Sequence, residues 1–62
     1  MGVISPTGRR ALAQLAANAD QGRATHRSAV HPSAREALLA RGLIEVDGDR
    51  LTITQAGREA VA

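Results

Sequence analysis

The sequence contains no phenylalanine, tyrosine or tryptophan, so a folded core must be built from aliphatic side chains alone. Alanine accounts for nearly half of the apolar residues, which leaves few large side chains to bury. A chain of 62 residues makes one domain with a small core, and such domains usually gain stability from a staple or a partner. We therefore expect a single domain over residues 1–62 that associates with a partner, a homodimer being one such form.

Cysteine is also absent, which excludes disulfide bonds and zinc sites built from thiolates. The two histidines, His26 and His31, are too few for a zinc site, which needs three or four ligands. Neither a Ser-His-Asp arrangement nor a pair of catalytic carboxylates stands out. We expect no metal, no cofactor and no enzymatic activity.

Long hydrophobic runs are missing too. The first ten residues, MGVISPTGRR, lack the apolar segment of a secretion signal, and no stretch is long enough to span a membrane. We expect a cytoplasmic protein with no membrane partner.

Lysine is the last notable absence, since all eight basic residues are arginines. Residues 1–31 hold four arginines and one aspartate, a net charge of +3, whereas residues 32–62 hold four arginines and five acids, a net charge of −1. The total of +2 permits binding to nucleic acid, and the first half is the more favourable part for it.

The first recognisable element is an amphipathic helix. Ser5 suits an N-cap and Pro6 the first helical position. Apolar residues then recur at i, i+3, i+4 and i+7 spacing on one face: Leu12, Leu15, Ala16 and Ala19. The helix should end between Asn18 and Gly22. Residues 20–32 follow, with room for a short strand or a single helical turn but not for a normal helix and two turns.

A second helix is predicted over SAREALLARG, with two possible starts. Ser33 and Glu36 have the spacing of a capping box, or Pro32 is the first helical residue and His31 the cap. Gly42 suits the left-handed position that ends a helix. Leu38 is the one large apolar residue on the inward face.

A β-hairpin and a short helix complete the chain. The apolar residues of LIEV and LTI flank Asp47-Gly48, a dipeptide that favours a type I′ turn with positive φ at both central residues. Thr54 then suits the cap of a last helix. Gly57 suits a close approach to the hairpin that leaves no room for a Cβ atom.

The stretch ALLARGLIEVDGDRLTITQAGREA resembles the recognition helix, wing and following helix of winged helix-turn-helix domains, with MarR-type regulators as the nearest pattern. The resemblance covers roughly residues 33–60. It is carried by the joint spacing of Leu38, Gly42, Leu43, Asp47-Gly48, Leu51, Thr54 and Gly57. It implies an α+β fold, a small abbreviated winged-helix-like domain, in which residues 20–32 stand in place of a full second helix.

The resemblance also implies a DNA-binding transcription regulator whose second helix enters the major groove of double-stranded DNA. Ser33 and Arg35, at the start of that helix, become candidates for contacting bases, although they also suit a plain cap and a solvated side chain beside Glu36. The candidates for phosphate contacts are Arg9, Arg10, Arg23, His26, Arg27 and Arg50.

Two features favour a protein partner instead. Asp47 and Asp49 place acids at the hairpin tip, which suits a winged-helix module that docks on another protein without binding DNA. Leu39 points away from the face of Leu38, so the first helix, the Val3-Ile4 segment or a partner must cover it. We expect Leu39 to contribute to an oligomer.

Overall fold

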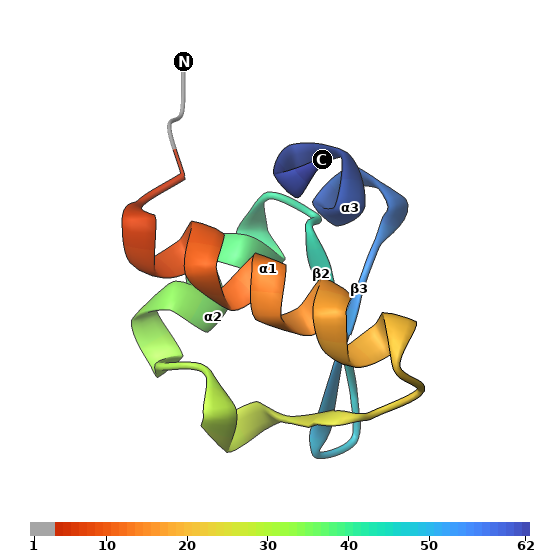
Figure 1. Ribbon diagram of the computed structural model, residues 1–62. Coiled ribbons are helices and arrows are strands. Elements are labelled where there is room, and N and C mark those ends of the chain that lie inside the picture. The colour runs from red at the N-terminus through yellow and green to blue at the C-terminus, as the bar shows by residue number, and fades with distance from the viewer. Residues whose placement is uncertain (1–3) are drawn as a thin grey trace.

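The computed structural model describes residues 4–62, which form three α-helices, one 3-10 turn and a three-stranded antiparallel sheet (Figure 1). The expected α+β class is confirmed. The elements in chain order are α1 (Pro6–Asp20), β1 (Thr25–His26), η1 (Arg27–Ala29), α2 (Pro32–Ala40), β2 (Ile44–Asp47), β3 (Arg50–Ile53) and α3 (Gln55–Val61). None of the described helices is long and apolar enough to cross a membrane.

The first helix begins and ends where its local sequence predicts. The Ser5 hydroxyl oxygen accepts a hydrogen bond from the Gly8 N–H at 3.1 Å, which satisfies one of the free donors of the first turn. At the other end Gly22 has a φ of 72°, and the Arg23 N–H bonds the carbonyl of Asn18 at 2.7 Å. This is the Schellman arrangement, and it turns the chain toward the sheet.

Both structures considered for residues 20–32 are present. β1 is a two-residue strand that pairs with β3, Thr25 lying opposite Leu51 and His26 opposite Arg50. The single 3-10 turn η1 follows directly. No full-length helix lies between α1 and α2, and the segment that joins them has two buried residues, Thr25 and Val30.

The second helix begins at Pro32, with His31 as its cap. The imidazole Nδ1 of His31 accepts a hydrogen bond from the Ser33 N–H at 3.2 Å. The capping box from Ser33 is therefore wrong, because Ser33 already lies inside the helix. The helix ends at Ala40, two residues before Gly42, whose φ is 71°, and the Leu43 N–H bonds the carbonyl of Leu38 at 3.0 Å.

The hairpin forms with a turn one residue later than predicted. Asp47 pairs with Arg50, so the central residues are Gly48 and Asp49, and of these Gly48 alone has a positive φ, 65°. The predicted type I′ turn is wrong, and the signs of φ match a type II′ turn. The register places Ile44 and Leu51 on one face of the sheet, where both are buried, and a shift by one residue would expose them.

The core lies where α1 crosses the sheet and meets α2 and α3 (Figure 1). The buried aliphatic residues are Leu12, Leu15, Val30, Ala34, Leu38, Leu43, Ile44 and Leu51. Five of them were named from the sequence as structural leucines. Ala19 was expected on the inward face of α1 but is exposed, because it lies on the last turn, beyond the leucines that contact the core.

The third helix is attached to the base of the hairpin through Thr54 and Gly57. The Thr54 hydroxyl accepts a hydrogen bond from the Gly57 N–H at 3.1 Å and donates one to the Gly42 carbonyl at 2.8 Å. A Cβ atom on Gly57 would overlap the carbonyl oxygen of Leu43 and the side chain of Ile53. The backbone of α3 therefore packs directly against the strand that follows α2.

Candidate nucleic-acid interface

Arg35 connects the first turn of α2 to η1. Its guanidinium Nη1 donates a hydrogen bond to the carbonyl oxygen of Arg27 at 2.8 Å. The side chain is half-buried by this contact, whereas that of Arg27 is exposed. Arg35 therefore keeps free N–H donors but is held toward η1, and the bond places two arginines from different elements beside one another.

The 3-10 turn is in turn connected to the hairpin tip. The Arg27 N–H donates to the carbonyl oxygen of Asp49 at 2.7 Å. His26 lies opposite Arg50 in the sheet, and its Nε2 is 3.5 Å from a carboxylate oxygen of Asp49. The first turn of α2, η1 and the hairpin tip thus form one continuous surface, which we call the arginine surface.

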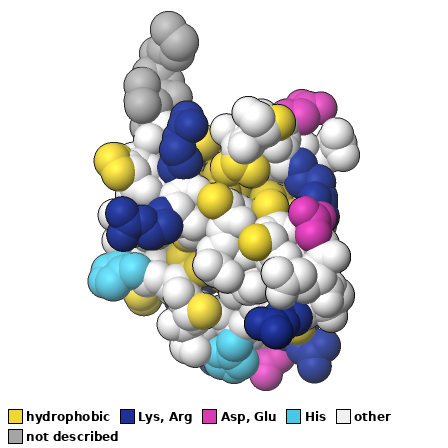
Figure 2. Space-filling model, viewed as in Figure 1, with side chains coloured by type: hydrophobic (Ala, Val, Ile, Leu, Met, Phe, Trp, Pro, Cys, Tyr) yellow, Lys and Arg dark blue, Asp and Glu magenta, His cyan; other side chains and the backbone are white. Residues whose placement is uncertain are grey.

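The arginine surface carries a positive net charge in spite of the acids at the tip. Four arginines contribute to it, and two aspartates oppose them, which leaves +2. The arginines are Arg23, Arg27, Arg35 and Arg50, and the aspartates are Asp47 and Asp49. Arg23 belongs to this end because it lines a shallow groove with Arg50 and Asp47. In Figure 2, arginine, histidine and acidic side chains lie together along the lower edge of the molecule.

Both histidines act as helix caps, a role that the sequence analysis considered for His31 and missed for His26. In His26-Arg27-Ser28 and in His31-Pro32-Ser33, the imidazole Nδ1 accepts from the serine N–H, at 3.1 and 3.2 Å. Each Nδ1 also lies 2.8 Å from the hydroxyl oxygen of the same serine. The repeated His-x-Ser spacing is the signal that identifies the pair.

The hydrogen bonds of these caps indicate which imidazole nitrogen carries the ring proton and where the serine hydroxyl hydrogen points. An Nδ1 atom that accepts from a backbone N–H carries no hydrogen, so the ring proton is on Nε2 and the serine hydroxyl donates to Nδ1. The Ser33 hydroxyl therefore offers its lone pairs, and not its hydrogen, to any base. The Nε2 atom of His26 is directed toward Asp49.

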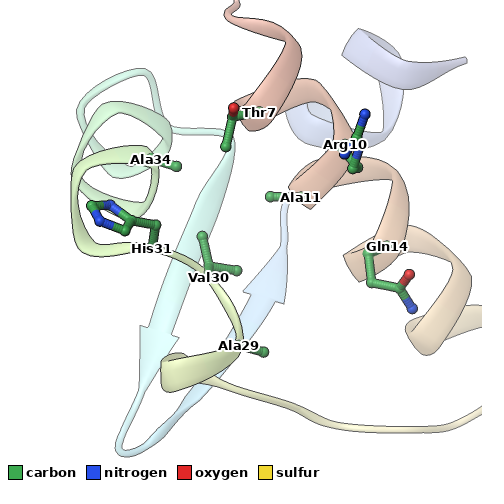
Figure 3. Close-up of a pocket in the computed structure, with 8 residues that line it drawn as sticks. All are labelled: Thr7, Arg10, Ala11, Gln14, Ala29, Val30, His31 and Ala34. Atoms are coloured by element: carbon green, nitrogen blue, oxygen red, sulfur yellow. The ribbon is translucent and has the colours of Figure 1, made fainter.

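Arg9 and Arg10 lie apart from the arginine surface, on the exposed side of α1. Arg10 and His31 contribute to the rim of a groove of about 270 Å³ between α1 and the segment from η1 to α2 (Figure 3). The apolar lining of this groove includes Ala11, Val30 and Ala34. Arg10 thus lies on α1, across the groove from the start of α2, and Arg9 does not line the groove.

The outer face of α2 is poor in basic groups. The exposed residues along the middle of the helix are Ser33, Glu36, Ala37 and Ala40. Leu39 is half-buried and packs against the core, as does Ile4, while Val3 lies outside the described residues. The rest of the chain therefore covers part of Leu39, and the contribution of Leu39 to an oligomer stays a prediction.

Comparison with known proteins adds no relative to this description. No protein-family model matches the chain, and no significant match was found among curated proteins or solved structures.

Proposed function

We propose that this chain is a winged-helix-like DNA-binding module, with α2 as the recognition helix and the β2–β3 hairpin as the wing. The order of elements supports the proposal: a helix, a short strand, a turn, a second helix, a hairpin and a last helix. In this interpretation η1 stands in place of a full second helix. The resemblance of residues 33–60 to MarR-type regulators gives independent support.

One observation carries the DNA-binding function. Arg35 bonds the carbonyl of Arg27, and the N–H of Arg27 bonds the carbonyl of Asp49, so a recognition helix and a wing would present their arginines on a single rigid surface. Arginines that are already held in place lose little conformational entropy on binding. This matters because a small module makes few contacts, and these cannot offset a large entropy cost.

The roles of the residues follow from their exposure. Arg23, Arg27 and Arg50 are exposed and suit phosphate contacts, which supply affinity without sequence preference. The remaining donors of Arg35 suit a guanine edge in the major groove. Ser33 can accept a hydrogen bond from a base amino group. Because one short helix reads few base pairs, we propose that a homodimer regulates transcription by binding two half-sites.

Fluorescence anisotropy at several salt concentrations tests this function. For the wild type, log affinity should fall linearly with log salt, with a slope of about −0.9 per phosphate neutralised. Arg27→Ala should reduce the slope by about one unit and weaken all duplexes equally, whereas Arg35→Ala should also relax sequence preference.

Arg9→Ala is the matched control, since Arg9 is an exposed arginine outside the arginine surface. Its slope should equal that of the wild type. Equal losses for Arg9→Ala and Arg27→Ala would remove the arginine surface from the interaction. Dissociation constants weaker than about 10⁻⁴ M on every duplex at physiological salt would reject DNA binding altogether.

A second function, a protein-interaction module without DNA binding, is favoured by the composition of α2. Its outer face presents Glu36 and two alanines, and the hairpin tip presents Asp47 and Asp49. A protein partner tolerates such acids, while a phosphate backbone does not. The salt titration separates the two functions, because a protein-interaction module should bind no DNA duplex at any salt concentration.

A further inference from the structure

We propose that the outer edge of β2 binds an extended segment of a partner protein in which aliphatic residues alternate with arginine or lysine. The strand order β1-β3-β2 leaves β2 paired on one side. Within residues 4–62 no other strand pairs with it. An unpaired edge is a template for another strand, and main-chain hydrogen bonds then supply the affinity.

The register shows which backbone groups face outward. The two-residue turn makes Asp47 and Arg50 a hydrogen-bonded pair, and such pairs alternate along an antiparallel ladder. Asp47 and Glu45 therefore direct their N–H and C=O groups toward β3. Ile44 and Val46 direct theirs to the outside. Val46 lies near the open end of β2, whereas Ile44 is buried.

The side chains of β2 present a different chemistry on each face. Val46 is 50% exposed, more than any other large hydrophobic residue among those described. It lies opposite Leu51, on the buried face of the sheet, and at its edge. An added strand would place an aliphatic side chain beside it, which extends the core outward.

The opposite face of the same strand is acidic. Glu45 and Asp47 are both exposed there, with Thr52 and Arg50 as their cross-strand neighbours. The ion pairs within residues 4–62, His26–Asp49 and Arg58–Asp20, involve neither of them. Two carboxylates beside one guanidinium leave a net negative charge, which cationic side chains of an added strand would complement.

The same acids exclude a second copy of β2 as the occupant. Antiparallel pairing of two β2 strands sets Glu45 opposite Asp47, or one of these acids opposite its own copy, and like charges directly opposite one another destabilise a sheet. The other edge strand, β1, has two residues and is too short to serve. A basic segment from a different protein is the occupant that fits both the apolar and the charged face.

This edge shares Asp47 with the arginine surface, but its outward-facing backbone groups lie on the opposite side of β2 from β1 and η1. β1 and η1 lie on the far side of β3 from β2 in the strand order, and the tip of the hairpin extends past α1 (Figure 1). The inference therefore does not depend on DNA binding. A basic segment would also be repelled by the arginine surface, which directs it to β2.

Amide chemical shifts of the whole isotope-labelled chain, titrated with synthetic peptides, test the inference. The probe is a short peptide of alternating valine and arginine with blocked ends. Saturable shifts should appear first at Val46 and its neighbours on β2. Two matched controls should not bind: the same peptide N-methylated at every second residue, which cannot form the ladder, and a peptide of alternating valine and glutamate.

Two variants sharpen the result. Val46→Pro removes an N–H that faces outward, a loss that an edge strand tolerates, and should weaken the basic peptide about tenfold. The double variant Glu45→Lys with Asp47→Lys should reverse the preference, so that the glutamate peptide binds more tightly than the arginine peptide. The reversal remains informative if the proline variant fails to fold.

Several outcomes would overturn the inference. Equal binding of the N-methylated peptide would show that no strand is added. Shifts confined to other elements, or no saturable shift at all, would remove β2 as a site. Concentration-dependent shifts on β2 without any peptide would show that a second copy is the occupant.

Discussion

The base and the tip of the β2–β3 hairpin are held in place by different means. At the base, Ile44 is buried and Gly57 allows the backbone of α3 to lie against the carbonyl of Leu43. At the tip, Gly48 has open space around it, and the turn is held by the bond from the Arg27 N–H to the carbonyl of Asp49. The base depends on close packing, and the tip on backbone conformation and hydrogen bonds.

This difference separates stability from function within one small element. Changes at the base should unfold the chain, because close-packed atoms cannot move apart without a loss of contacts. Changes at the exposed tip should alter binding while the fold persists. The variants below test that separation, from the largest expected effect to the smallest.

Leu38→Ala should have the largest effect. Leu38 is 1% exposed and lies beneath the turn that leads from α2 into the hairpin base. Removal of its side chain should lower the free energy of unfolding by about 2–5 kcal/mol, which approaches the whole stability of so small a core. Thermal melting by circular dichroism measures the change. A variant that melts within a couple of degrees of the wild type would show that Leu38 does not support the core.

Gly57→Ala should cost about 1–3 kcal/mol, because the added methyl group overlaps a backbone carbonyl that cannot rotate away. The matched change at the tip is Gly48→Val. It should lower the free energy of unfolding by about 1–2 kcal/mol, because valine is strained at positive φ although the space around position 48 is open.

The two glycines can be told apart with D-alanine, introduced by chemical synthesis. A D-residue adopts positive φ without strain, so D-alanine at position 48 should melt like the wild type. D-alanine at position 48 that destabilises as much as Gly48→Val would mean that the space, and not the conformation, constrains the tip.

His31→Ala should lower the free energy of unfolding by about 1 kcal/mol, because it removes the acceptor for the Ser33 N–H at the start of α2. His31→Asn restores a side-chain acceptor and should recover most of that loss. Equal melting temperatures for the two variants would show that the imidazole contributes nothing as a cap.

Arg50→Ala should have the smallest effect on folding, within about 0.5 kcal/mol, because the side chain is exposed on β3. Under the proposed function it should nevertheless weaken binding to all duplexes. Unchanged affinity in the anisotropy titration would remove Arg50 from the DNA contacts, and a large loss of stability would contradict the separation of base and tip.

The ends of the elements were predictable because they depend on neighbours within a few residues. Ser5-Pro6 begins α1, Gly22 and Gly42 end α1 and α2, and Thr54 begins α3, each through a bond to a group at most five positions away. For α2 the sequence left two starts open. Histidine is outside the usual set of capping residues, and a serine two positions later competed with it.

The arrangement of the candidate site was decided by contacts between distant segments. The bonds of Arg35 to Arg27 and of Arg27 to Asp49 join residues that no local pattern relates. The turn shifted by one residue because the observed register pairs Ile44 with Ile53 and Val46 with Leu51, whereas a turn at Asp47-Gly48 would pair Val46 with Asp49. Sequence alone determined where α1 and α3 begin and where α1 and α2 end, since the hydrogen bonds at these positions join near neighbours. Only the tertiary structure decided which arginines share a surface and which edge stays open, because burial of the core sets the register of distant segments.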